Sequence, residues 1–122
     1  MTDLHWKSAA KLVKGYAKKK FSPVEVAQAC LAQIERHDKQ LNAMVAVHAD
    51  EALAQAKASE ARWHKGAPQG PVDGVPTLIK DLLLVRGWPT LRGSRTGRSP
   101  YSRLGPVKGR SKASISAAPS RV

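Results

Sequence analysis

Apolar residues recur every three or four positions in two stretches near the start of the chain, which is the spacing of an amphipathic helix. The first stretch predicts a helix over residues 8–18. Its apolar face consists of Ala9, Leu12, Val13 and Tyr16. A second helix is predicted to begin after Ser22 and to end at residues 36–38. Its apolar face consists of Ala27, Cys30, Leu31 and Ile34. We expect both helices to pack these faces against a shared core.

The start of the second helix carries the clearest local signal in the chain. Ser22 suits the N-cap, Pro23 suits the first helical position, and Glu25 completes a capping box with Ser22. Phe21 and Val26 stand at the spacing of a hydrophobic staple. The sequence therefore fixes this helix start with little dependence on the rest of the fold.

Two strands and a third helix are predicted downstream. Residues 43–47 are apolar throughout, which indicates a short strand buried on both faces. A helix over residues 50–64 follows, and Gly66 would end it. Its apolar side consists of Ala52, Leu53, Ala56 and Trp63. After a loop rich in Gly and Pro, residues 75–80 form a second strand. Strand, helix and strand in this order permit a right-handed parallel crossover, so the predicted fold class is α/β.

Charge divides the chain into two parts. Residues 1–81 hold 12 Lys/Arg and all 9 Asp/Glu, a net charge of +3, whereas residues 82–122 hold 9 Lys/Arg and no acid, a net charge of +9. After Thr96 the sequence has no sustained hydrophobic period. Such a segment buries too little apolar surface to offset its ordering entropy. We therefore expect one folded unit over residues 1–96 and a disordered basic tail over residues 97–122.

Cysteine content and hydropathy point to a cytoplasmic protein. Cys30 is the only cysteine, so the chain cannot form an internal disulfide, and we interpret this residue as part of the core. The longest apolar run, residues 82–85, is far shorter than the roughly 20 residues that span a bilayer. No secretory signal pattern opens the chain. We expect no membrane partner.

A lysine closes the last predicted strand. Residues 74–81 read Gly-Val-Pro-Thr-Leu-Ile-Lys-Asp, so Lys80 stands at the C-terminal end of a short apolar run. Gly-Pro-Val-Asp precedes this run at residues 70–73, and Arg-Gly-Trp-Pro-Thr follows at residues 86–90. Ser94, a little further on, is interpreted as a turn residue.

Together with Ser-Pro-Val-Glu-Val at residues 22–26 and Leu-Asn-Ala at residues 41–43, this block resembles the amidase signature family. The likeness covers about residues 8–96, in the family's usual order. It implies the N-terminal helices and first strands of a large mixed sheet. Family members are serine hydrolases that cleave carbon–nitrogen bonds of small-molecule amides, and they use neither a metal nor an organic cofactor.

The resemblance implies a catalytic role for Lys80. In the family, a lysine acts through a bridging serine, in a cis peptide, as the general base for a nucleophilic serine, and backbone N–H groups of a glycine-rich turn hold the oxyanion. A lysine that serves as a base must be neutral, and burial favours the neutral form. We expect residues 77–79 to supply that burial at the strand end. Asp81 should point to the opposite face, in a structural role.

The family's nucleophile is missing from these residues. The family carries it in a Gly-Gly-Ser-Ser-Gly-Gly-like turn, and no such run occurs here. The C-terminal serines stand in basic, irregular sequence: Ser99, Ser102, Ser111, Ser114, Ser116 and Ser120. The chain is therefore interpreted as a truncated amidase that keeps only the lysine and is inactive. Whether the parent is a free amidase or a relative that releases ammonia from glutamine for transamidation of charged tRNA stays open.

The change of composition at Thr96 suggests that residues 97–122 are a frameshift product. Residues 97–100, Gly-Arg-Ser-Pro, can be encoded so that the frame one base later gives Val-Asp-Pro, which commonly follows this point in related amidases. The nucleotide sequence from codon 96 tests the hypothesis, because the shifted frame must then contain a glycine-rich serine motif.

Two other functions fit parts of the sequence. A basic nucleic-acid-binding module would use the arginines Arg86, Arg92, Arg95, Arg98, Arg103 and Arg110. Against it, only Trp88 and Tyr101 offer stacking there, and residues 18–20 are interpreted as a solvated helix end. Alternatively, the chain is a remnant that pairs with a full-length amidase through its unpaired strands. The four histidines lack the spacing of a metal site.

Overall fold

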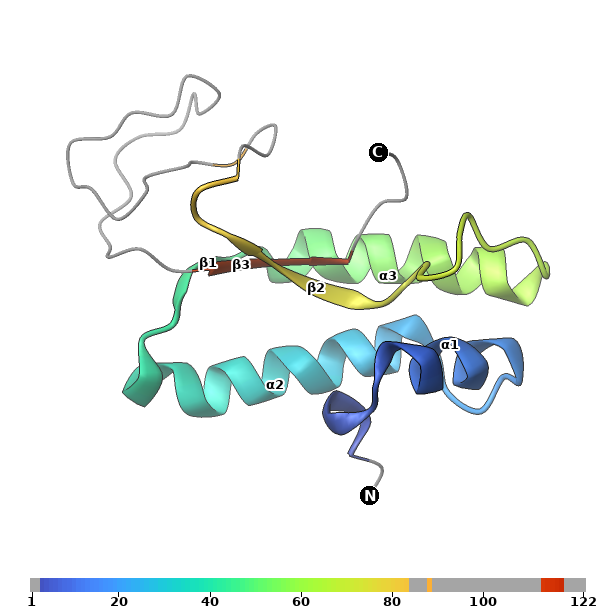
Figure 1. Ribbon diagram of the computed structural model, residues 1–122, viewed down its shortest axis with the longest axis horizontal. Coiled ribbons are helices and arrows are strands. Elements are labelled where there is room, and N and C mark those ends of the chain that lie inside the picture. The colour runs from blue at the N-terminus through green and yellow to red at the C-terminus, as the bar shows by residue number, and fades with distance from the viewer. Residues whose placement is uncertain (1–2, 84–87, 89–112, 118–122) are drawn as a thin grey trace.

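The computed structural model describes residues 3–83, 88 and 113–117. Its elements in chain order are the 3-10 turn η1 (Leu4–Trp6), α1 (Ala9–Ala17), α2 (Pro23–Leu41), β1 (Met44–Val47), α3 (Ala49–His64), β2 (Pro76–Lys80) and β3 (Ala113–Ala117). The two long helices α2 and α3 lie against each other and against the strands, and α1 packs at one end (Figure 1). The predicted fold class, helices combined with the first strands of a mixed sheet, is confirmed.

The strands form a sheet in the order β1-β3-β2. β3 runs parallel to β1 and antiparallel to β2, with Lys80 opposite Ala113. The predicted parallel crossover between residues 43–47 and 75–80 is therefore wrong. Sequence rules assume that consecutive strands pair, whereas here a strand from much later in the chain lies between them.

The tail contributes this central strand, which the sequence did not indicate. Predicted disorder does not hold for residues 113–117, because they hydrogen-bond to both neighbouring strands. Ser114 and Ser116 therefore belong to a strand rather than to irregular sequence. The rest of residues 97–122 lies outside the described part of the chain.

The apolar face of α1 packs against η1 and α2. Leu12 and Tyr16 are buried together with Leu4 and Val26, and Phe21 packs against this cluster at the start of α2. The predicted helix over residues 8–18 is confirmed to within a residue at each end. Ala9 is exposed, however, since it lies at the first turn, beyond the reach of the core.

The start of α2 agrees with its sequence signals, whereas its end does not. Ser22 Oγ accepts a hydrogen bond from the backbone N–H of Glu25 at 3.2 Å, and Glu25 Oε2 accepts one from the N–H of Ser22 at 2.7 Å. The predicted end at residues 36–38 is wrong, because α2 continues to Leu41 and ends at Asn42, which has a φ of 51°. No Gly or Pro interrupts residues 36–41, so nothing local stops the helix earlier.

The predicted stripe on α2 is only partly buried. Ala27 is buried, whereas Cys30, Leu31 and Ile34 are half-buried. Burial raises the pKa of the Cys30 thiol, which fits the predicted core role rather than a reactive one. Burial of β1 on both faces is also wrong, since Met44 is buried but Val47 is 43% exposed. The short sheet leaves one end of β1 uncovered.

α3 matches its prediction closely. It spans Ala49–His64, and Gly66 follows it with a φ of 69°. Ala52 and Ala56 are buried against the rest of the fold. Across the described part of the chain, no helix is both long and apolar enough to span a membrane.

Trp88 packs over the junction of β1 and α3. Its ring stacks on His48 with 4.5 Å between ring centroids, and its Nε1 donates a hydrogen bond to Glu51 Oε2 at 3.1 Å. Trp88 is only 7% exposed. It is therefore not available to stack on a nucleic-acid base, as the basic-module hypothesis requires. The arginines of that hypothesis, Arg86, Arg92, Arg95, Arg98, Arg103 and Arg110, lie outside the described residues.

Candidate functional site

Lys80 is the last residue of β2, and its backbone is held in a tight turn. Its carbonyl oxygen accepts hydrogen bonds from the backbone N–H groups of Leu82, at 2.8 Å, and Leu83, at 3.1 Å. On the other side, its backbone lies opposite Ala113 of β3. The main chain that carries the lysine is thus restrained from both directions.

The Lys80 side chain is exposed, so the predicted burial at the strand end is wrong for the residues described. Because side chains alternate along a strand, Leu78 shares the face of Lys80, and it is 56% exposed. Leu82 and Leu83 are 49% and 54% exposed. An apolar sequence ensures burial only when another layer covers that face. Asp81, by contrast, is buried, in agreement with the predicted opposite orientation.

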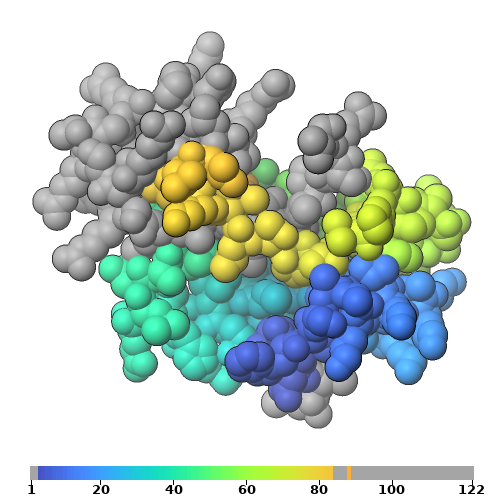
Figure 2. All heavy atoms as spheres, viewed as in Figure 1, coloured from blue at the N-terminus to red at the C-terminus, as the bar shows by residue number. Residues whose placement is uncertain are grey.

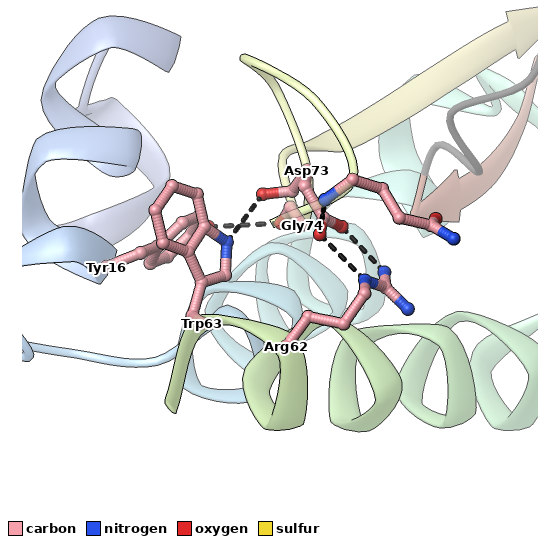
Figure 3. Close-up of polar contacts among 6 residues, drawn as sticks. Tyr16, Arg62, Trp63, Asp73 and Gly74 are labelled. Atoms are coloured by element: carbon pink, nitrogen blue, oxygen red, sulfur yellow. Dashed lines mark hydrogen bonds and ion pairs between the residues drawn. The ribbon is translucent and has the colours of Figure 1, made fainter. Parts of the chain in front are cut away.

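The loop before β2 is anchored through a buried carboxylate (Figure 3). Asp73 Oδ2 and Oδ1 accept hydrogen bonds from Arg62 Nε, at 2.8 Å, and Arg62 Nη2, at 2.7 Å. Asp73 Oδ2 also accepts one from the backbone N–H of Gln69, at 3.0 Å. The side chain of Asp73 is 1% exposed. A two-point guanidinium–carboxylate pair of this kind fixes orientation as well as distance.

Two aromatic side chains hold the backbone of the same loop (Figure 3). Trp63 Nε1 donates to the carbonyl oxygen of Asp73, and the Tyr16 hydroxyl donates to the carbonyl oxygen of Gly74, both at 3.1 Å. The two rings pack against each other with 5.9 Å between centroids. We call Tyr16, Arg62, Trp63, Asp73 and Gly74 the loop clamp, because they tie the start of β2 to α1 and α3.

The Arg62–Asp73 pair of the clamp stays ionised near neutral pH. Hydrogen bonds from Arg62 chiefly, and from the N–H of Gln69, lower the pKa of Asp73 to about 2 against the opposing effect of burial. The pair with Asp73 raises the pKa of Arg62, and burial raises the pKa of the Tyr16 hydroxyl. None of these groups exchanges a proton near neutral pH. The clamp is therefore built to hold the loop rather than to transfer protons.

Gly74 is required by both its conformation and its surroundings. Its φ is +81°, in the left-handed region that favours glycine. A Cβ placed there would lie 2.5 Å from Ser59 Oγ and 2.9 Å from Pro23 Cγ. The loop therefore crosses α2 and α3 so closely that only a hydrogen fits.

Gly74→Ala is expected to lower the free energy of unfolding by about 3 kcal/mol, through backbone strain plus crowding against Ser59 and Pro23. Gly66→Ala is the matched control: its φ is also positive, at +69°, but no atom lies within 4 Å of the added Cβ. That variant should lose only about 1 kcal/mol. Urea unfolding followed by circular dichroism measures both. Equal losses would show that crowding at Gly74 is unimportant.

Lys80 is a candidate from the sequence alone, whereas the residues of the clamp are not. Gly and Pro marked residues 66–76 as a loop, yet nothing local indicates that Asp73 pairs with Arg62. Six residues of extended chain separate Gly74 from Lys80, about 20 Å. The clamp therefore acts on the lysine only by fixing the strand between them. The predicted turn residue Ser94 lies outside the described residues.

Lys80 lines neither of two cavities on the described surface. The larger, of about 670 Å³, lies between α2 and α3 and includes Leu31, Ile34, Val47 and Leu53. The smaller, of about 220 Å³, lies where Tyr16, Lys20 and Trp63 meet. In the part of the chain that is described, no group of three or more His, Cys, Asp or Glu could hold a metal ion.

Comparisons with known proteins give one consistent result. A family model described as Amidase matches residues 25–102, reaching beyond residue 96, the limit of the resemblance in the sequence. The chain is 46% identical over 81 residues to a glutamyl-tRNA(Gln) amidotransferase subunit of Anaeromyxobacter dehalogenans, covering 66% of this chain and 16% of that protein. It is 42% identical over 92 residues to the corresponding subunit of Methylococcus capsulatus, covering 75% of this chain and 19% of that protein.

The likeness extends to structure. A crystal structure of a bacterial aryl acylamidase of the amidase signature family matches 94% of this chain with a TM-score of 0.71 and 33% identity. The match covers 25% of the acylamidase. These 122 residues thus span a quarter or less of the length of the relatives named here.

Proposed function

Since the chain belongs to the amidase family, we propose that it is part of an enzyme that hydrolyses a carboxamide carbon–nitrogen bond, with Lys80 as general base. Lys80 stands at the end of the strand in a block that matches the family's lysine segment. The observation that carries the assignment is this position on a strand whose backbone is fixed at both ends, by the clamp and by the turn at residues 80–83.

In the proposed mechanism the neutral amine of Lys80 accepts a proton from a bridging serine, which in turn accepts one from the nucleophilic serine. The serine oxygen then attacks the amide carbon, and the tetrahedral oxyanion is held by backbone N–H groups. Collapse of this intermediate breaks the carbon–nitrogen bond, and the proton leaves with the amine or ammonia. Water hydrolyses the acyl-enzyme and releases the acid. In this proposal both serines are supplied by other parts of the enzyme.

The surroundings of Lys80 support the proposal. Leu78, Leu82 and Leu83, which lie within three residues of Lys80 in the sequence, are exposed apolar side chains. A further protein layer over these leucines would remove apolar surface from water and place Lys80 in a drier environment. Desolvation of that kind favours the neutral lysine that a base requires. The exposure of Lys80 is thus compatible with a catalytic role in a larger domain.

A polypeptide of these 122 residues should have no amidase activity by itself. A base accelerates acyl transfer only when a nucleophile and an oxyanion site are in place. The chain has no glycine-rich serine turn to supply either group. Turnover of a simple amide by this polypeptide, lost on Lys80→Ala, would contradict the proposal of incompleteness.

The relatives favour one class of amide. Identity is 42–46% to the two glutamyl-tRNA(Gln) amidotransferase subunits and 33% to the aryl acylamidase. We therefore favour an enzyme that provides an amide nitrogen to glutamyl-tRNA(Gln) over one that hydrolyses aryl amides. A relative's ability to transfer ammonia to charged tRNA separates the two classes, and an assay of ammonia release from glutamine by the whole enzyme would decide between them.

A graft tests the shared chemistry directly. Residues 4–83 replace the matching segment of the bacterial aryl acylamidase, which supplies the serines and the rest of the sheet. We expect the graft to hydrolyse an aryl amide within about a hundredfold of the parental rate, because the fold and the lysine segment correspond. A folded graft with no activity, as judged by circular dichroism and amine release, would contradict the proposed role of this segment.

A further inference from the structure

The positive charge of the folded part is concentrated at its N-terminal end. Residues 4–24 contain six lysines and no acid, a net charge of +6. Residues 25–81 contain six Lys/Arg and eight Asp/Glu, a net charge of −2. The two parts of one small fold therefore differ in sign. This asymmetry is independent of the basic tail, and amide hydrolysis makes no use of it.

The lysines of α1 share one face. Leu12 and Tyr16 turn inward, whereas Lys11, Lys14 and Lys18 are all exposed. Their spacing of three and four residues places them in a row on the opposite side of the helix. Lys11 and Lys18 lie about 10 Å apart along the helix axis. Within the described residues, none of the three lies within ion-pair distance of a carboxylate.

An exposed aromatic ring precedes this row. Trp6, two residues before the N-cap Ser8, is 81% exposed. It stands in η1, which joins α1 in one continuous patch of the molecular surface (Figure 2, dark blue). The exposed face of this ring is free to contact a partner that also contacts the nearby helix α1.

We propose that Trp6 and the lysine row of α1 form a binding surface for single-stranded nucleic acid. The row presents three positive charges over about 10 Å, enough to contact up to three phosphates of one strand. Trp6 supplies a stacking platform for a base at one end of the row. The inference goes beyond the proposed amidase chemistry and does not depend on it. Sequence alone favoured a solvated helix end for Lys18, because Lys11 and Lys14 had not been placed in one row with it.

A membrane surface fits the same patch less well. Interfacial helices insert an apolar face below a charged one. The apolar face of α1 is already buried against α2 and η1 through Leu12 and Tyr16. Only Trp6 would remain to enter the lipid, which favours a polyphosphate strand as the partner.

The test compares variants of the full 122-residue chain binding to a fluorescein-labelled 12-nucleotide RNA, followed by fluorescence anisotropy at several salt concentrations. The first variant is Lys11→Gln/Lys14→Gln/Lys18→Gln. The matched control is Lys39→Gln/Lys57→Gln/Lys65→Gln, which makes the same change of charge on α2 and α3. We expect the first to weaken binding by tenfold or more at about 0.1 M salt and to reduce the salt slope by about 2. The control should change affinity less than twofold.

Three further variants locate the site. Trp6→Ala should weaken RNA binding by about fivefold or more, whereas Leu41→Ala, which removes another exposed apolar side chain, should have no effect. Arg98→Gln/Arg103→Gln/Arg110→Gln removes the same number of positive charges from the tail. Equal losses of RNA affinity from all three charge variants would show that only the net charge matters, and this would overturn the proposal. So would a loss confined to the tail variant, or lysine-dependent binding to anionic phospholipid vesicles without binding to RNA.

Discussion

Replacing Asp73 with alanine is expected to lower the free energy of unfolding by about 3 kcal/mol. The change removes the acceptor of two Arg62 hydrogen bonds and of the Gln69 backbone N–H. It leaves a cavity where a fully buried side chain stood. Arg62 keeps 28% of its side chain exposed, so it can turn partly to water, which limits the loss. Urea unfolding followed by circular dichroism measures the change.

The matched control is Glu35→Ala, which removes an exposed carboxylate from α2 and should change stability by less than about 0.5 kcal/mol. Arg62→Ala should destabilise the fold as strongly as Asp73→Ala, and the double variant should lose much less than the sum of the two, because both single changes break the same pair. Additive losses would show that Asp73 and Arg62 stabilise the fold independently and would contradict the clamp.

The loss of stability at low pH is a second measure of the Asp73–Arg62 contact. The pKa of Asp73 falls from 3.8 to about 2 in the folded chain, chiefly through Arg62. A lowered pKa stabilises the fold above the unfolded value, and this contribution, about 2 kcal/mol, is lost as the pH falls from about 4 to 2. The parent should lose this part of its stability on acidification, whereas Asp73→Ala should not.

Local chemistry made several elements predictable. The pairing of Ser22 with Glu25 needs only four neighbouring residues, and the structure contains both of its hydrogen bonds. The third helix and the second strand follow from apolar spacing and from Gly and Pro at their ends. Residues 74–81 also carried enough of a motif to indicate the family.

Contacts between distant segments could not be predicted in the same way. The position of β3 between β1 and β2 depends on pairing across more than thirty residues of sequence. The pairing of Arg62 with Asp73 depends on how α3 crosses the loop, which no local pattern records. Exposure of Lys80 depends on which layers cover the sheet, and the apolar residues before it gave the opposite expectation.

Lys80→Ala in the acylamidase graft is expected to lower the rate of amide hydrolysis by about a thousandfold or more. Without the base, neither serine can lose its proton, and single changes in such triads remove most of the catalysis. Lys65→Ala, which removes an exposed lysine after α3, serves as the control and should leave the rate unchanged. A loss below about tenfold for Lys80→Ala would place the base elsewhere.

Lys80→Arg in the same graft separates a base from a structural charge. Arginine keeps the positive charge and the length of the side chain, but it cannot give up its proton in the working pH range. If Lys80 is the base, this variant loses about a thousandfold or more in rate while its unfolding midpoint stays within a few degrees of the parent graft. Activity within tenfold of the parent would show that only a positive charge is needed there, and Lys80 would not be the proton acceptor.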